Sequence, residues 1–473
     1  MAPVMGASTK HAQPFVSVAP RIGFVGGLDG IRGVLILLVM LEHSNIGKFR
    51  SATGGVDIFY VVSGFLITSL LLQEHRGNGS IDIRKFYSRR AIRLLPSVWL
   101  MLLSTIVIVA LFARDLLVGL LQEAAAAFFY CYHLFFPVGY DLFHNMTDSK
   151  RVYLLVQLWS LSVEEQFYLV VAFAAVLFIG RNWIKQLVVL LVGVIVLATV
   201  ARWLGHPGPR IILIQRPDVP AIGVLVAIVN AKMDEERAER WRKPLLIVGT
   251  IGITIAALTM FAGSVAIWKV VTSVFGIPRI RADGLRTQGW SSFFWPMTYT
   301  EAGYPAKPWR SPDQTTVRYW WQFGSTVVAV GVAPAILCMA RYKDWFVNRW
   351  LSWRPWRVLG RMSYTIYVWH GFYFMVLENA FKNSMPHLQL MAIQFAVGMG
   401  VSAAVYYLVE QRILGWKLRY SAEKEVVDLR TGEMVSVASL TGDVPATGSD
   451  PPTDPADAPG SDEPSHEPQS EST

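Results

Sequence analysis

The most prominent pattern along the chain is a series of long apolar runs separated by short polar segments. A helix needs about 20 mainly apolar residues to cross the hydrocarbon core of a bilayer. The weakest run is 116–137, because it contains Gln122, Glu123, Tyr132 and His133. The pattern predicts an all-α fold, a polytopic membrane helix bundle. Eleven runs approach the required length, and they lie near residues 28–46, 55–73, 95–113, 116–137, 160–180, 185–204, 211–230, 244–263, 322–340, 359–379 and 389–409.

Lys and Arg residues are concentrated in three of the polar segments, namely the one between the second and third runs, residues 232–243 and residues 341–357. Loops rich in Lys and Arg stay on the cytoplasmic side of a membrane. Three loops share one side only when even numbers of spans separate them, which holds if 116–137 is a re-entrant or surface helix. We therefore predict a multi-pass protein with about ten transmembrane helices in a cell membrane, with both termini in the cytoplasm. In the alternative, 116–137 spans the membrane and one loop breaks the charge rule.

The composition agrees with a membrane protein and excludes several other classes. Only 16% of the residues are charged, whereas soluble domains have about 25%. The two cysteines are too few for a disulfide framework or a zinc cluster, so no metal site is predicted. The net charge of +9 is explained by the cytoplasmic loops and needs no nucleic-acid partner.

Polarity also divides the chain into three regions. Residues 431–473 contain nine acidic residues and no Lys or Arg, and they are rich in Pro, Ser, Gly and Thr, which is typical of disorder. We expect a cytoplasmic N-terminal segment at 1–27, a membrane domain at 28–415 and an acidic, largely disordered cytoplasmic tail at 416–473. Within the membrane domain, the long segment 264–321 is expected to be an ordered external insertion.

Ionisable residues inside the apolar runs are candidates for function, because charges are costly in a bilayer. Arg32 and His43 are eleven residues apart in the first run. In a helix they therefore lie about 20° from the same face and roughly 16 Å apart along the axis. This spacing predicts one cavity, with Arg32 near its cytoplasmic mouth and His43 near its outer mouth. The alternative is that Arg32 snorkels to the headgroups and His43 caps the helix.

The second run and the segment after it carry further polar groups. Asp57 begins the second run, where it can orient a histidine or an arginine, or cap the helix. Ser63 precedes a glycine in the middle of that run, and such a small pair allows close helix approach. In the next segment Arg89, Arg90 and Arg93 cluster on one side of a helix. Because guanidinium groups bind phosphate bidentately, the cluster predicts a phosphate or pyrophosphate site, and ordinary positive-inside topology is the alternative.

Two more motifs lie in later runs. Glu164 and Glu165 come at the outer start of a run, where the helix dipole favours a carboxylate, and capping explains only one of the two. Ser363, Tyr367 and His370 share one helix face by their spacing of four and three residues. A histidine in such aromatic surroundings is more often structural than catalytic.

Five segments in this order resemble the acyltransferase-3 family of integral membrane O-acyltransferases: LDGIRGVLILLVMLEH, GGVDIFYVVSGFLIT, FYSRRAIRLLPSVW, LWSLSVEEQFYL and GRMSYTIYVWH. The resemblance covers roughly residues 24–415. It implies a ten-helix membrane core and transfer of an acyl group, often acetyl, from cytoplasmic acyl-CoA to a hydroxyl of an envelope glycan or glycolipid. The family's motifs map onto Arg32 with His43, Arg90 with Arg93, Ser63-Gly64-Phe65, Glu164 to Phe167, and Ser363, Tyr364, Tyr367 and His370.

The residues and the resemblance together predict an O-acyltransferase mechanism. Acyl-CoA is the donor substrate rather than a permanently bound cofactor, the arginine cluster binds its phosphates, and its acyl arm passes Arg32. His43 acts as general base on the acceptor hydroxyl. Asp57 or Glu164 orients the imidazole, because a catalytic base needs a third group to hold it. The expected partners are the lipid bilayer, acyl-CoA and an envelope glycan or glycolipid.

Other classes of function stay open at this point. A transporter or flippase of an envelope precursor could line its pathway with Arg32, Asp57, Arg216 and Asp218, although the sequence lacks the internal repeats that many transporters have. An inactive, scaffold-like relative is a third class. Within the enzymes, the acceptor could be a small molecule such as a macrolide, and the long insertion at 264–321 leaves the acceptor undecided.

Overall fold

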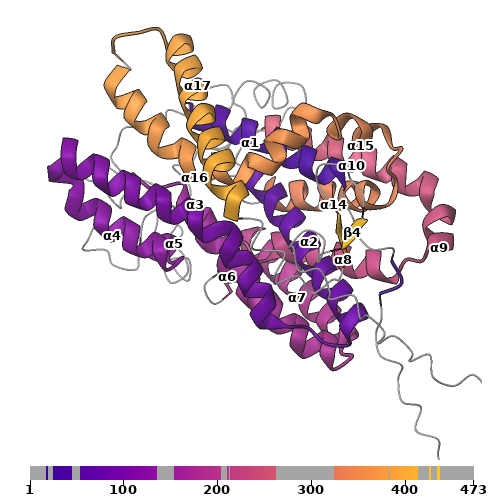
Figure 1. Ribbon diagram of the computed structural model, residues 1–473. Helices are drawn as coiled ribbons and strands as arrows, with labels where there is room; N and C mark the ends of the chain where they lie inside the picture. The colour runs from indigo at the N-terminus through magenta and orange to yellow at the C-terminus, as the bar shows by residue number, and fades with distance from the viewer. Residues whose placement is uncertain are drawn as a thin grey trace, which may run out of the picture.

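The computed structural model of this chain is an assembly of α-helices (Figure 1). The predicted insertion at 264–321 lies outside the described residues, as do most of the segment 1–27 and most of the tail 416–473. The all-α prediction is confirmed for the described part of the chain, where the only strands are two short antiparallel pairs. The structure describes residues 17–19, 25–44, 54–135, 154–203, 210–211, 214–262, 324–381, 383–413, 425–427 and 434–436.

The helices follow the order of the apolar runs. They are α1 (Gly26–His43), α2 (Gly54–Asn78), α3 (Ile83–Phe112), α4 (Leu117–Phe128), α5 (Tyr132–Phe135), α6 (Leu158–Ala174), α7 (Ile184–Trp203), α8 (Asp218–Lys232), α9 (Glu235–Arg240), α10 (Arg242–Ala262), α14 (Ser325–Arg341), α15 (Phe346–Leu351), α16 (Arg354–Phe381) and α17 (His387–Val405). A 3-10 turn, η1 (Arg114–Leu116), precedes α4, and π-helical turns η3 (Ala175–Ile179) and η6 (Tyr406–Glu410) extend α6 and α17. The strand pairs are β1 (Arg210–Ile211) with β2 (Ile214–Gln215), and β3 (Glu425–Val427) with β4 (Met434–Ser436).

Several of these helices can cross a membrane. Each of the ten predicted spans contains a helix, but α8 and α14 have only 15 and 17 residues, so the number of spans stays a prediction. Within the described residues, six helices are long and apolar enough to span by length and composition: Gly54–Asn78, Ile83–Phe112, Leu158–Ile179, Ile184–Ala201, Arg242–Met260 and His387–Ile413.

The doubtful run at 116–137 forms two short helices rather than one span. The 12 residues of α4 rise about 18 Å, which is less than the roughly 30 Å of a hydrocarbon core. After α4, Tyr130 adopts the left-handed region (φ 53°) and the chain turns into α5. The buried carboxylate of Glu123 accepts hydrogen bonds from the hydroxyl of Tyr132 (2.8 Å) and the backbone N–H of Leu155 (2.9 Å). Glu123, whose charge makes this run a weak candidate for a span, therefore connects α4 to the segment just before α6.

A close crossing of α1 and α16 determines how the polar ends of these helices meet. A Cβ atom on Gly360 of α16 would lie 1.7 Å from the carbonyl oxygen of Asp29, and one on Gly33 of α1 would lie 2.1 Å from that of Trp356. Only glycine fits at such backbone contacts, which are the means by which small residues bring membrane helices together. The two helices lie side by side at the centre of the molecule (Figure 1).

A second glycine crossing joins α2 and α8. A Cβ atom on Gly64 would lie 2.4 Å from the carbonyl oxygen of Pro220, and one on Gly223 would lie 2.1 Å from that of Val61. The predicted span at 211–230 needs a correction here, because its first residues belong to β1 and β2 and the helix begins only at Asp218. The apolar run is therefore interrupted before it continues as α8.

Candidate active site

Two histidines from the crossing helices α1 and α16 contact each other. Nε2 of His370 lies 3.2 Å from Nδ1 of His43, and the ring centroids are 5.0 Å apart. Nδ1 of His43 also lies 2.9 Å from the carbonyl oxygen of Val39. His370 is fully buried, whereas the side chain of His43 is exposed. His43 therefore presents a ring that a substrate can reach, supported from behind by His370.

The ring of His43 contacts groups other than the two carboxylates expected from the sequence. In the described part of the chain, Val39 and His370 supply the hydrogen-bond contacts of its ring. Asp57 and Glu164 bond elsewhere. Among the described residues, the structure does not bring either carboxylate to the imidazole, so their orienting role stays a prediction. Asp57 accepts from Arg216, and Glu164 accepts from Ser63 and Tyr168.

A layer of hydroxyl groups lies next to the histidine pair. Tyr367, one turn before His370 on α16, donates to the carbonyl oxygen of Gln157 (2.7 Å) and makes a short hydrogen bond with Ser160 of α6. The hydroxyl of Tyr60, on α2, donates to the carbonyl oxygen of Ser160 (3.1 Å). These contacts tie α2, α6 and α16 together around His43. Tyr367 was a sequence-based candidate, whereas Tyr60 and Ser160 were not.

Glu164 of α6 forms the next polar group toward Arg32. Its Oε1 accepts a hydrogen bond from the hydroxyl of Ser63 at 2.6 Å and another from the hydroxyl of Tyr168. Glu164 is also close enough to Arg32 to act on the charge of the guanidinium. Ser63 and Glu164, two candidates from different motifs, are thus brought together. Tyr168 follows Glu164 by one helical turn, a spacing that could have identified it.

The predicted arginine cluster on α3 is divided among different partners. Arg90 makes two hydrogen bonds to the carboxylate of Glu165 (2.6 and 3.3 Å), and its guanidinium stacks 3.3 Å above the ring of Tyr168. Arg89 makes an ion pair with Glu74 of α2 at 2.8 Å. These two arginines are neutralised by protein carboxylates. The structure therefore does not direct Arg89 and Arg90 to one common partner, because helix packing places them beside separate neighbours. Phosphate binding by the cluster of Arg89, Arg90 and Arg93 stays a prediction.

Arg32 and Arg93 have a different environment from the other arginines. The two guanidinium groups, from α1 and α3, are close enough to repel each other, and both act on the carboxylate of Asp29. Arg361 of α16 also acts on Asp29. All three arginines are partly exposed, and none makes a hydrogen bond or ion pair with another described residue. The guanidinium groups at this end of the site therefore have N–H donors available for an anion.

A buried carboxylate that the sequence analysis did not single out lies near these cations. Glu410, at the end of the π-helical turn η6, makes a short hydrogen bond with Thr365 of α16 and acts on the charges of Arg32 and Arg93. Its signal in the sequence was an ionisable residue at the end of an apolar run. π-Helical turns occur frequently at functional sites.

Asp57 takes part in a buried ion pair away from the histidines. Arg216 donates to Oδ1 of Asp57 at 2.9 Å, and their side chains are 5% and 0% exposed. Arg216 adopts the left-handed region with φ 49°, which costs of order 1 kcal/mol or more for a residue other than glycine. Asp218, at the start of α8, accepts a hydrogen bond from Thr326 of α14 (3.3 Å). This network joins α2, α8 and α14.

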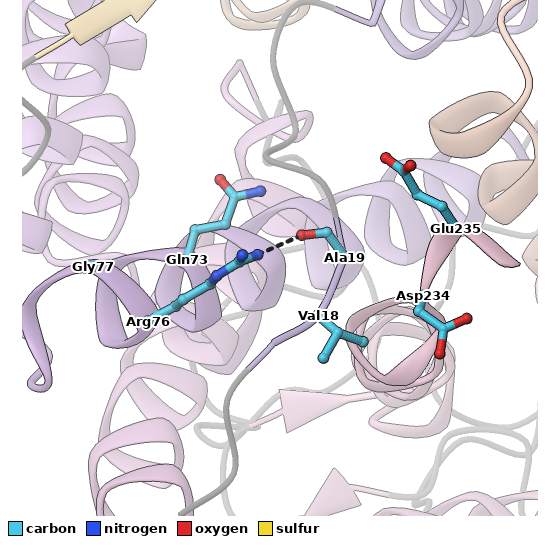
Figure 2. Close-up of a pocket in the computed structure, with 7 residues that line it drawn as sticks. All are labelled: Val18, Ala19, Gln73, Arg76, Gly77, Asp234 and Glu235. Carbon is cyan, nitrogen blue, oxygen red and sulfur yellow. Dashed lines mark hydrogen bonds between the residues drawn. The ribbon is translucent and has the colours of Figure 1, made fainter. Parts of the chain in front are cut away.

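A surface pocket lies at the end of α2, where its lining residues Gln73 and Arg76 flank Glu74, the partner of Arg89. Figure 2 shows this pocket, of about 490 Å³, between the end of α2 and the start of α9. Arg76 donates to the carbonyl oxygen of Ala19 across it (2.8 Å). None of the candidate site residues lines it. The lining residues are Val18, Ala19, Gln73, Arg76, Gly77, Asp234 and Glu235. Among the described residues, no group of three or more His, Cys, Asp or Glu side chains could hold a metal ion.

Comparison with known proteins gives the arrangement a family context. The chain is similar to YrhL of Bacillus subtilis, with 29% identity over 73% of this chain and 48% of that protein. It is similar to the peptidoglycan O-acetyltransferase OatA of Listeria monocytogenes, with 24% identity over 82% of this chain and 56% of the relative. The O-acetyltransferase OatA of Staphylococcus aureus is 34% identical over 36% of this chain and 28% of its own length.

These relatives are longer than the present chain, which spans about half the length of the first two. No solved structure matches it. The profile of the acyltransferase-3 family, described as an acyltransferase domain, matches residues 25–410, an interval that contains every candidate residue of the site. The chain therefore belongs to the acyltransferase-3 family of integral membrane acyltransferases.

Proposed function

We propose that this chain is a membrane O-acetyltransferase that moves an acetyl group from acyl-CoA to a hydroxyl of an envelope glycan, with peptidoglycan as the first acceptor to test. Membership in the family supports an acyltransferase over a transporter or flippase. The names of the Listeria and Staphylococcus relatives support acetyl as the acyl group, and the Listeria name supports peptidoglycan as the acceptor. The observation that carries the proposal is the pairing on α1 of an exposed histidine with an arginine that makes no ion pair among the described residues.

The donor side of the site is the Arg32 end. Guanidinium groups whose N–H donors are not used in an ion pair are suited to bidentate binding of phosphate. Among the described residues, Arg32 and Arg93 form no ion pair or hydrogen bond with a carboxylate, although Asp29 and Glu410 lie near them. In this proposal they bind the phosphates of acyl-CoA on the cytoplasmic side. Arg90, which is held by Glu165, keeps α3 in place rather than binding the donor.

The acceptor side is the His43 end. The extended arm of acyl-CoA carries the thioester along α1 toward the histidine. His43 removes the proton from the acceptor hydroxyl while the hydroxyl oxygen attacks the thioester carbonyl. The new C–O bond forms as the C–S bond breaks, and the proton passes from His43 to the departing thiolate of CoA. Atoms and charge are balanced without any metal or redox group.

The test of the base uses purified protein in lipid nanodiscs, with radiolabelled acetyl-CoA and solubilised peptidoglycan fragments as substrates. His43→Ala is expected to lower the rate of O-acetylation by about 10²–10⁴, as the loss of a general base does. His387→Ala is the matched control, because His387 is exposed at the start of α17, and it should keep the wild-type rate. O-acetylation by His43→Ala at the wild-type rate would remove the base from the proposal.

The donor assignment has its own test in the same assay. Arg93→Lys should raise the KM for acetyl-CoA and leave the acceptor KM unchanged, because Lys cannot reproduce the bidentate fork. Arg89→Lys is the control, since its ion pair with Glu74 tolerates a single cationic donor. Equal effects of the two variants on the donor KM would contradict the assignment.

A further inference from the structure

Two backbone carbonyl oxygens beside the ring of His370 determine which of its nitrogens carries a proton. Its Nδ1 lies 2.9 Å from the carbonyl oxygens of both Ile366 and Tyr367. A carbonyl oxygen only accepts hydrogen bonds, so Nδ1 must bear the hydrogen. His370 is 0% exposed, and the groups that surround its ring are His43, Tyr367 and Phe374. Since a buried charge without a partner is unfavourable, the ring is neutral and Nε2 keeps its lone pair.

This assignment fixes the tautomer of His43. Nδ1 of His43 faces two acceptors, the lone pair on Nε2 of His370 (3.2 Å) and the carbonyl oxygen of Val39 (2.9 Å). The hydrogen of His43 therefore lies on Nδ1. Its Nε2 is left with a free lone pair, and no hydrogen bond among the described residues involves that atom. Which nitrogen of a histidine is protonated is set by the bond that the other one makes.

We propose that His370 is a positioning residue that holds His43 in the Nδ1–H tautomer, so that Nε2 of His43 serves as the base. This inference rests on the proposed function, in which His43 removes the acceptor proton. It replaces the sequence-based interpretation of His370 as a structural histidine. In many enzymes a carboxylate orients the histidine and stabilises the imidazolium, whereas here a neutral imidazole does the orienting. A neutral imidazole supplies no countercharge to an imidazolium. His43 therefore passes the proton on to the departing thiolate.

The tautomer can be observed without any activity measurement. Nitrogen-15 NMR of protein labelled at the histidine rings, in nanodiscs, distinguishes a protonated from an unprotonated ring nitrogen. The His43 signal, identified as the one that disappears in His43→Gln, should show a protonated Nδ1 and an unprotonated Nε2. A wild-type His43 with its proton on Nε2 would overturn the inference.

Two variants of His370 separate positioning from packing. His370→Phe keeps a ring but has no acceptor, so the His43 signal should shift toward the Nε2–H form and kcat should fall about 10- to 100-fold, as it does when an outer partner of a histidine is lost. The donor KM should stay the same. His370→Gln, whose side-chain oxygen can accept from Nδ1 of His43, should restore the tautomer and most of kcat. A wild-type tautomer together with wild-type kcat in His370→Phe would also overturn the inference.

The proposed function and this inference can fail separately. If His43→Ala retains O-acetylation while the wild-type NMR signal shows the Nδ1–H tautomer, the catalytic base is wrong and the positioning by His370 stands as structure. If His43→Ala is inactive but the tautomer is Nε2–H, the base stands and the role of His370 is refuted. Should His370→Phe fail to fold, the wild-type spectrum and His370→Gln still decide.

Discussion

The crossing of α1 and α16 predicts a large effect from the smallest possible substitution, Gly360→Ala. A Cβ atom at this position would lie 1.7 Å from the carbonyl oxygen and 2.6 Å from the carbonyl carbon of Asp29, whereas ordinary contacts are 3.4–4 Å. The obstructing atoms belong to the backbone and cannot rotate away. The two helices must therefore separate by roughly 2 Å at the crossing, since that is the difference between the two distances.

The consequence reaches the two histidines further along the same helices, His43 at the end of α1 and His370 ten residues beyond Gly360 in α16. A displacement of this size exceeds what the 3.2 Å contact between His43 and His370 can absorb, because a separation beyond about 3.5 Å is no longer a hydrogen bond. Overpacking typically costs about 1–3 kcal/mol of stability. A misplacement of about 1 Å can cost on the order of 10²-fold in rate. We therefore expect Gly360→Ala to lower both the melting temperature and kcat.

The measurement compares Gly360→Ala with a control substitution of the same kind. An ideal Cβ at Gly400 of α17 has no atom within 4 Å, so Gly400→Ala should be neutral or more stable by up to about 1 kcal/mol through helix propensity. Thermal unfolding in detergent, followed by size-exclusion chromatography, reports stability, and the acetyl-transfer assay reports kcat. Wild-type values of both for Gly360→Ala would refute the reasoning from the crossing.

Two further predictions concern the buried ion pair and the orientation in the membrane. Asp57→Asn should destabilise the protein by about 3–5 kcal/mol, because it removes the negative charge that lies 2.9 Å from the buried guanidinium of Arg216. The double variant with Arg216→Met should melt higher than Asp57→Asn, and the opposite order would contradict the pairing. In a background without native cysteines, Ser80→Cys should react with an impermeant thiol reagent only after permeabilisation of the cells, whereas Ser384→Cys should react in intact cells. Both positions are exposed in loops, and labelling from one side alone would contradict the predicted topology.

The sequence predicted the positions of the helices along the chain better than it predicted which helices and side chains contact each other. Hydropathy located the helices because lipid imposes the same length and composition on every span. One continuous helix, α1, contains both Arg32 and His43, as the apolar run predicted, whereas a common cavity for the two residues stays a prediction. The run 211–230 was wrong at its start because β1 and β2 depend on a hydrogen-bonded register, which hydropathy does not report.

The candidate site also depends on contacts between helices that the sequence did not predict. Helical spacing clustered Arg89, Arg90 and Arg93 on α3, yet Glu74 and Glu165 neutralise the first two. Those carboxylates come from α2 and α6, and no local pattern specifies which helix packs against which. For the same reason the carboxylates that the sequence offered as partners of His43 are bound to other groups.

A shared geometry of α1 and α16 links the two ends of the proposed reaction. Each of these helices carries an arginine beside the glycine crossing and a histidine further along, with Arg32 and His43 on α1 and Arg361 and His370 on α16. The separation along α1, eleven residues, corresponds to about 16 Å, the same order as the extended arm of acyl-CoA. Glycine contacts hold the two helices together at the arginine end. The packing at that end therefore sets how the helices lie relative to each other, and with it the contact between His43 and His370 that orients the base in the proposed reaction. The crossing glycines are therefore part of the catalytic geometry, although they touch no substrate.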